Sequence, residues 1–183
     1  MRNGQACLHS YSIVEMDAQV RTVAAEINEF LRGRHMTLST AESCTGGGVA
    51  AAITSCPGSS DVFKGSVVAY ANEIKSSVLA VPESILTEYG AVSEATVRAM
   101  AAGVSSLMKT DCAVATSGIA GPGGGTDEKP VGTVWVAIVV SGAVSVALLQ
   151  LPDRGRDENI KATIIKVLEL LKLALCENVN AAK

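Results

Sequence analysis

Apolar and polar positions alternate along the chain in two periods, one typical of helices and the other of strands. Five apolar residues at steps of three or four form the first run: Met16, Val20, Val23, Ile27 and Phe30. This spacing predicts an amphipathic helix, which Gly33 ends. Segment 35–42 then predicts a strand, and segment 45–55 predicts a helix that is entered through glycines.

The middle of the chain repeats this order after a loop at 55–61 that is rich in small and turn-forming residues. Segment 65–71 predicts a strand, and segment 72–81 predicts a short helix that stops before a proline. Ser93 has the residue type of an N-cap, and Glu94 suits the first turn of a helix. The apolar face expected on that helix comprises Val97, Met100, Ala101, Val104, Leu107 and Met108.

The last part of the chain predicts three strands and a helix. Segment 112–119 has a buried-strand pattern, and the glycine-rich segment 120–132 is expected to be a loop. Segments 133–140 and 143–150 are separated by two residues, which predicts an antiparallel hairpin. The final helix places its apolar residues on one face: Ile160, Ile164, Val167, Leu168, Leu171 and Leu175.

Alternating helices and strands predict an α/β fold. We expect a single three-layer α/β/α domain over 14–178, preceded by a loose leader at 1–13, because 183 residues suit one domain. The sheet should be mixed and mainly parallel, with one antiparallel hairpin.

Composition restricts the classes of function. The net charge of −3 provides no basic field for nucleic acid, so no nucleic-acid partner is expected. The five cysteines are irregularly spaced, which predicts neither a disulfide framework nor a zinc site. No signal-peptide run or 18-residue apolar span occurs, so we expect a cytoplasmic protein without membrane attachment. Alanine-rich helices and a mean hydropathy of +0.33 favour a homo-oligomer.

The two histidines favour neither a histidine-dependent hydrolase nor a metal site. His9 belongs to the leader and His35 to a corner before a strand. A serine nucleophile would then need another base, and a neutral, desolvated lysine is an established one. Ser106 and Lys109 match the S-x-x-K pattern, but they close a predicted surface helix and are interpreted as structural.

Ser43 is the better-placed nucleophile, since it ends a predicted strand and opens a helix. Backbone amides from Cys44 onward would be available there to stabilise an oxyanion, and the glycines would let a substrate approach. Two alternatives stay open: Ser43 is an N-cap, or Cys44 is the nucleophile rather than a small buried residue. Segment 121–125, GPGGG, is either a turn or a nest of amides for a phosphate or amide group, and it matches no nucleotide-binding motif.

Taken together, six ordered stretches resemble the CinA carboxy-terminal domain, the family of nicotinamide-nucleotide amidases. They are AESCTGG (41–47), PGSS (57–60), YANEIK (70–75), GAVSE (90–94), SGIAGPGGG (117–125) and EKPVGTVW (128–135). The resemblance runs from about residue 20 to 175. It implies hydrolysis of nicotinamide mononucleotide to nicotinic acid mononucleotide and ammonia, without metal or cofactor.

The resemblance also assigns roles to residues. It implies Ser43 as nucleophile, Lys75 as base and Tyr70 as a proton-relaying or positioning partner. The substrate is expected to contact Cys44, Thr45, Gly46, Asn72, Gly121, Gly123, Gly124 and Arg156.

Two positions depart from the family pattern. Ala71 replaces a common serine, and Asp157 stands at a common arginine position, with Arg156 beside it. Two other functions therefore remain open: hydrolysis of a different small amide, and a catalytically idle ligand-binding or regulatory domain.

Overall fold

A five-stranded mixed sheet forms the centre of the molecule, in the order β2-β1-β3-β4-β5. The computed structural model describes residues 18–181. The strands are β1 (Leu38–Glu42), β2 (Phe63–Val68), β3 (Cys112–Gly118), β4 (Thr133–Val140) and β5 (Ala143–Gln150). Strands β2, β1 and β3 are mutually parallel, and β4 is antiparallel to both β3 and β5. Only β4 therefore runs against the others, which confirms the mixed, mainly parallel sheet.

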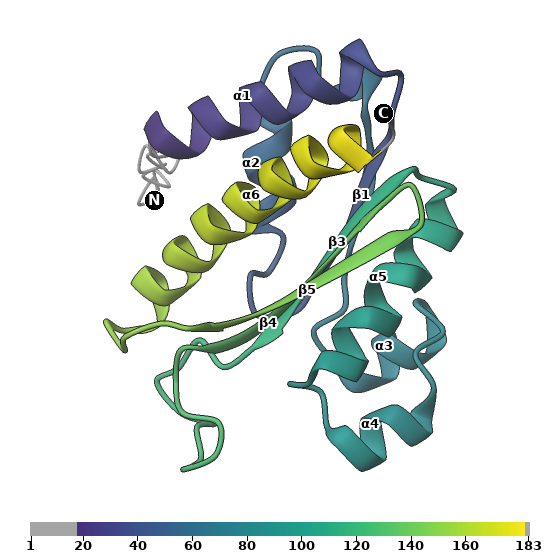
Figure 1. The fold of residues 1–183 in the computed structure, drawn as a ribbon. Helices are drawn as coiled ribbons and strands as arrows, with labels where there is room; N and C mark the ends of the chain where they lie inside the picture. Colours follow the sequence, from purple (N-terminus) through teal and green to yellow (C-terminus); the bar gives the residue numbers. More distant parts are fainter. Residues whose placement is uncertain (1–17, 182–183) are drawn as a thin grey trace, which may run out of the picture.

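Helices cover both faces of this sheet (Figure 1). One face carries α1 (Ala18–Gly33), α2 (Gly48–Thr54) and α6 (Arg156–Ala181). The other carries α3 (Asn72–Ser77), α4 (Glu83–Tyr89) and α5 (Glu94–Met108). Each face encloses its own aliphatic core, because successive strand residues point to opposite sides. The three-layer α/β/α fold is confirmed.

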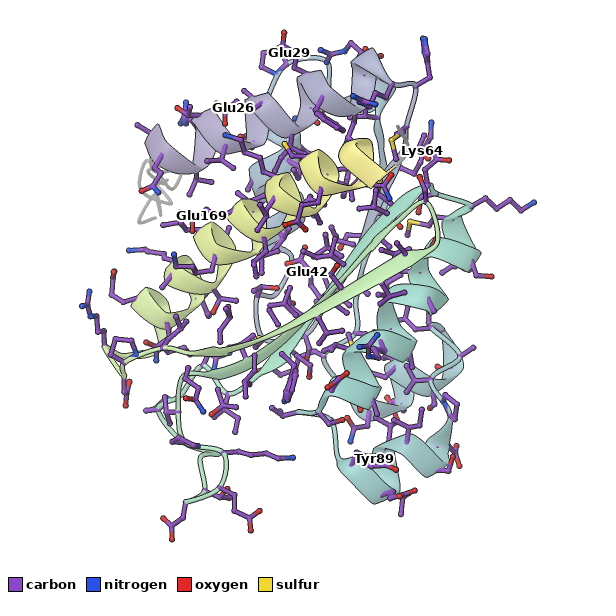
Figure 2. All side chains as sticks on the ribbon, in the orientation of Figure 1. Glu26, Glu29, Glu42, Lys64, Tyr89 and Glu169 are labelled. Atoms are coloured by element: carbon purple, nitrogen blue, oxygen red, sulfur yellow. The ribbon has the colours of Figure 1, made fainter. Side chains whose placement is uncertain are left out.

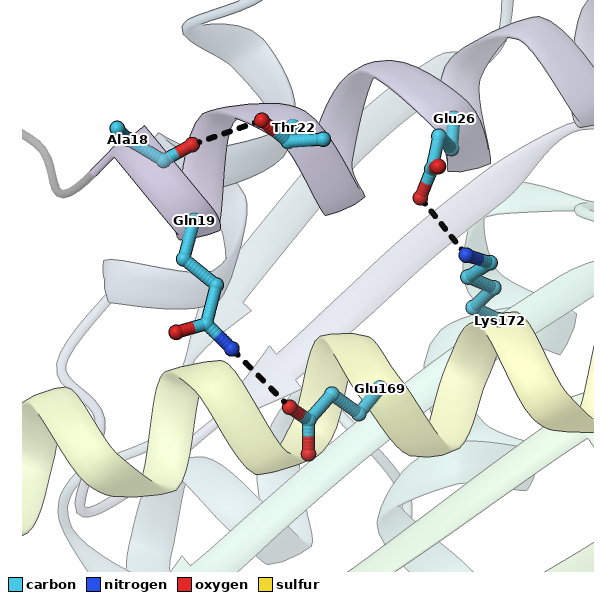
Figure 3. A network of polar contacts seen from close by, with 6 residues as sticks. All are labelled: Ala18, Gln19, Thr22, Glu26, Glu169 and Lys172. Atoms are coloured by element: carbon cyan, nitrogen blue, oxygen red, sulfur yellow. Dashed lines mark hydrogen bonds and ion pairs between the residues drawn. The ribbon is translucent and has the colours of Figure 1, made fainter.

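Helices α1 and α6 lie side by side in the outer layer (Figure 3). The Gln19 amide donates to Glu169 over 3.3 Å, and Lys172 forms an ion pair with Glu26 at 2.8 Å. These contacts are exposed, so their contribution is small. The packing rests on buried apolar residues such as Ile27 and Leu171.

Several boundaries differ from the sequence expectations. The first strand begins at Leu38 because His35 adopts a positive φ of 54° in the turn before it. Helix α2 begins at Gly48, and residues 43–47 form turns rather than helix. Strand β2 covers Phe63–Val68, and α3 ends at Ser77.

The α4 helix was absent from the prediction. It buries no residue completely, so it carries little of the apolar periodicity by which the other helices are identified. In contrast, the predicted N-cap Ser93 is confirmed, since its hydroxyl accepts a hydrogen bond from the Thr96 amide. The expected leader and Met16 lie outside the described residues. Across residues 18–181, no helix combines the length and apolar character needed to cross a membrane.

Candidate active site

The carboxyl ends of the three parallel strands meet at one edge of the sheet. Chain segments that follow β1, β2 and β3 enclose a cavity of about 190 Å³ there. Its lining comprises Ser43, Cys44, Tyr70, Asn72, Lys75, Ala91, Val92, Ser117, Gly118, Ala120 and Arg156. Ligand sites of open α/β sheets commonly occupy this position.

Ser43 and Lys75 meet inside the cavity. The Lys75 Nζ lies 3.3 Å from the Ser43 Oγ, although the two residues are far apart in sequence. Ser43 is 8% exposed and Lys75 only 1%. Lys75 is the one completely buried residue of α3, a short helix that directs this side chain toward the end of β1.

The burial of Lys75 acts in favour of its neutral form. Burial lowers the pKa of Lys75, because the charged form loses hydration. The Nζ also donates to the carbonyl oxygens of Ala69, at 2.8 Å, and Tyr70, at 3.1 Å. In the neutral form, the amine has two N–H groups for these carbonyls and one lone pair, which can accept the proton of the Ser43 hydroxyl. This is the arrangement that a general base requires.

Ser43 is not an N-cap, which excludes one alternative interpretation of the motif. The N-cap of α2 is Gly47, and the amides at the start of this helix donate to the carboxylate of Glu42. An incoming phosphate would find this helix terminus already occupied. These amides are therefore not available to a phosphate, and the Ser43 Oγ instead accepts a hydrogen bond from the Lys75 Nζ.

Cys44 lines the cavity but is poorly suited as a nucleophile. Burial raises the pKa of its thiol to about 12, and Glu42 adds a smaller effect in the same direction. The reactive thiolate is consequently scarce near neutral pH. Among the described residues that line the cavity, Lys75 carries the only buried amine, and its contact with the Ser43 Oγ favours the hydroxyl over the thiol.

Arg156 reaches the cavity although it precedes the family's usual arginine position by one residue. It begins α6, and its guanidinium donates to the Gly121 carbonyl at 2.8 Å and the Tyr70 hydroxyl at 3.1 Å. Asp157 is exposed and does not line the cavity. Tyr70 is 62% exposed, so this pair lies at the cavity mouth.

Several predicted substrate contacts lie elsewhere. Thr45 is buried and bonds to Glu42 and Thr116, while Gly46 is exposed in the turn. Gly123 and Gly124 are exposed in the long loop, outside the cavity lining. Direct contacts from these four residues remain predictions. Asn72 lines the cavity, and Gly121 takes part through the carbonyl that holds Arg156.

One wall of the cavity is formed by residues to which the sequence assigns no role. Ala91 and Val92 form it between α4 and α5. The Ser117 hydroxyl donates to the Ala91 carbonyl at 2.7 Å, and the Lys129 Nζ donates to the Val92 carbonyl at 2.9 Å. The GAVSE, SGIAG and EKPVG motifs were the available signal, because all three supply parts of this wall.

His35 cannot serve the site. It precedes the amino end of β1, whereas Ser43 follows the carboxyl end, so roughly 17 Å of strand separates them. Within residues 18–181, no three His, Cys, Asp or Glu side chains form a group suited to a metal ion.

Comparisons with known proteins agree on one family. Residues 20–175 match the family model of the CinA C-terminal domain. A CinA-like protein from Cytophaga hutchinsonii is 46% identical over 156 residues, covering 85% of this chain and 37% of that protein. One from Synechocystis sp. is 51% identical over 138 residues, covering 74% and 33%. The chain therefore spans about a third of the length of these relatives.

Solved structures share the fold. The competence/damage inducible protein CihA from Agrobacterium tumefaciens superposes with a TM-score of 0.85 at 40% identity, covering 88% of this chain and 98% of that one. A CinA superfamily protein from Klebsiella pneumoniae gives a TM-score of 0.83 at 32% identity, covering 86% and 98%.

Proposed function

Since the chain belongs to the CinA C-terminal domain family, we propose that it hydrolyses nicotinamide mononucleotide to nicotinic acid mononucleotide and ammonia. The observation that carries this proposal is the 3.3 Å contact between the Ser43 hydroxyl and the buried Lys75 amine. A serine beside a neutral lysine is suited to acyl transfer from an amide.

The reaction proceeds in two halves. Ser43 Oγ attacks the carboxamide carbon while its proton passes to the neutral Lys75 Nζ. The tetrahedral intermediate collapses, the C–N bond breaks, and Lys75 returns the proton to the leaving nitrogen, which departs as ammonia. Water then attacks the acyl-enzyme with Lys75 again as base, releasing the carboxylate and restoring Ser43.

The oxyanion of each intermediate needs backbone donors close to Ser43. The Cys44 amide directly follows the nucleophile, as one oxyanion-hole donor does in other serine hydrolases. The α2 amides that donate to Glu42 are engaged, so we assign the oxyanion to the turn before them. Such donors are worth about 10²–10³ in rate.

The phosphate of the substrate is assigned to the cavity mouth. Arg156 lies there with Tyr70, and its fork of N–H groups matches phosphate oxygens. In this proposal Tyr70 is a positioning partner, because its hydroxyl contacts Arg156 and its carbonyl contacts Lys75. A proton-relay role has less support, since neither Ser43 nor Lys75 bonds to the Tyr70 hydroxyl.

An assay of ammonia release from nicotinamide mononucleotide tests the proposal, with nicotinic acid mononucleotide quantified by chromatography and Ser43→Ala as the control. Turnover by the wild type but not by the variant supports it. Covalent labelling of Ser43 without turnover of this substrate would instead indicate an amidase for another small amide. Ligand binding with neither labelling nor turnover would indicate an idle regulatory domain.

A further inference from the structure

We infer that Glu42 is a positioning residue that keeps Ser43 and Lys75 at hydrogen-bond distance from each other. Glu42 is completely buried, and across residues 18–181 it forms no ion pair. Figure 2 shows it in the interior, whereas the other labelled residues lie toward the periphery. A buried carboxylate without a cation needs other compensation, and the chain provides it through hydrogen bonds.

The side chain of Glu42 organises the turn that carries Ser43. Its carboxylate accepts hydrogen bonds from the amides of Gly47 and Val49, both at 3.0 Å, and of Ala50, at 2.8 Å. The hydroxyl of Thr45 donates at 2.7 Å. These contacts tie the two ends of the segment 43–47 together, because Glu42 precedes the turn and the amides belong to its last residue and to the helix that follows.

The main chain of Glu42 organises the other half of the pair. Its carbonyl accepts from the Ala69 amide at 2.8 Å, and the Ala69 carbonyl in turn accepts from the Lys75 Nζ at 2.8 Å. One residue thus connects to the nucleophile through its side chain and to the base through its backbone. The contact between Ser43 and Lys75 depends on both connections.

This arrangement differs from an ordinary helix cap. A cap accepts hydrogen bonds from the free amides of its helix and thereby stabilises it. Glu42 lies immediately before the nucleophile, so a shift of the turn moves the Ser43 Oγ relative to the Nζ. Misplacement of a reacting group by about 1 Å costs about a hundredfold in rate.

The inference rests on the proposed function for its kinetic arm. Glu42→Gln keeps the side-chain volume but replaces one acceptor oxygen with an NH2 group that faces N–H donors. We expect kcat to fall by roughly tenfold or more. KM should change by less than about twofold, because the variant leaves the cavity mouth unaltered. The rate of Ser43 labelling by a fluorophosphonate probe should fall in parallel.

Asn28→Leu is the matched control. The Asn28 amide, also buried, donates to the Ile53 carbonyl at the opposite end of α2, at 3.0 Å. Both variants remove a buried hydrogen bond that holds this helix, but only Glu42 touches the reactive turn. With thermal stability measured for each, we expect Asn28→Leu to retain wild-type kcat and labelling.

Thr45→Val provides a milder perturbation if Glu42→Gln does not fold, since it removes only one donor to Glu42. A smaller loss of kcat and labelling is expected for it. Crystal structures of the variants give a readout that does not depend on activity. Lengthening of the Ser43 Oγ–Lys75 Nζ distance beyond hydrogen-bond range supports the inference.

Unchanged kinetics with an unchanged distance would overturn the inference, as would equal losses in Glu42→Gln and Asn28→Leu. If the wild type neither hydrolyses nicotinamide mononucleotide nor reacts with the probe, the proposed function fails. The distance in the variant structures then decides the role of Glu42 by itself.

Discussion

Replacement of Arg156 by alanine tests which part of the cavity holds the phosphate. The guanidinium bridges the Gly121 carbonyl and the Tyr70 hydroxyl, so its position is fixed before any ligand arrives. These two contacts leave further N–H groups of the guanidinium unengaged. We expect those groups to bind the phosphate of nicotinamide mononucleotide.

The expected magnitude follows from charge and exposure. A hydrogen bond to a charged group contributes about 1.5–3 kcal/mol, and 1.4 kcal/mol corresponds to about tenfold in affinity. Because the neighbouring Tyr70 is 62% exposed, solvent screening favours the lower end of this range. We therefore expect Arg156→Ala to raise KM about tenfold and to change kcat much less.

The assay compares two substrates, nicotinamide mononucleotide and its riboside, which lacks the phosphate. The KM difference between variant and wild type should largely disappear with the riboside. Arg154→Ala is the matched control, since Arg154 is exposed two positions earlier and does not line the cavity. Unchanged kinetics in Arg156→Ala, or an equal KM increase for both substrates, would refute the assignment of the phosphate to Arg156.

Four further predictions concern the reactive pair and the sheet edge. Ser43→Ala should abolish hydrolysis and Cys44→Ala should retain most of it, as measured by ammonia release; the reverse result would identify the thiol as nucleophile. The rate should rise with pH through an apparent pKa below 10.5, because burial lowers the pKa of Lys75 and only its neutral form is a base. Lys75→Arg should be nearly inactive, since guanidinium stays protonated, and full activity in it would exclude Lys75 as base. Copies of the chain are expected to associate through the uncharged edge strand β5, on which Val144 and Leu148 are each 42% exposed. Leu148→Lys should then lower the molar mass that light scattering measures. A monomeric wild type would contradict this prediction.

The sequence predicted the layers because apolar residues recur at a regular spacing in each element that buries one face. Helix α5 shows this clearly, since its expected apolar face includes the buried Val97, Met100 and Val104. Helix α4 has no buried residue and was missed for that reason. The turn at 43–47 was also misjudged, because glycines with positive φ at Gly46 and Gly47 delay the start of the helix.

The reactive pair was partly accessible from sequence. Because the chain has two histidines, a serine nucleophile was expected to use a lysine base, and the family resemblance identified Lys75 as that lysine. The sequence also predicted that Arg156 reaches the substrate site, and the structure adds how its side chain is held there. Its side chain extends from α6 to the Gly121 carbonyl and the Tyr70 hydroxyl. A shift of one position in the sequence does not show how far a flexible arginine side chain reaches.

The arrangement around Glu42 also explains how a lysine base can serve a nucleophile that directly follows a buried carboxylate in the sequence. An ion pair between Glu42 and Lys75 would favour the ammonium form and raise the pKa of Lys75. The carboxylate instead accepts from the amides of α2 and from neighbouring hydroxyls, and within residues 18–181 the Nζ donates only to Ser43 and to two neutral carbonyls. Because the negative charge is compensated by the helix terminus, the amine is left without a counter-ion. Burial lowers the pKa of Lys75, which favours the neutral state that the proposed chemistry requires.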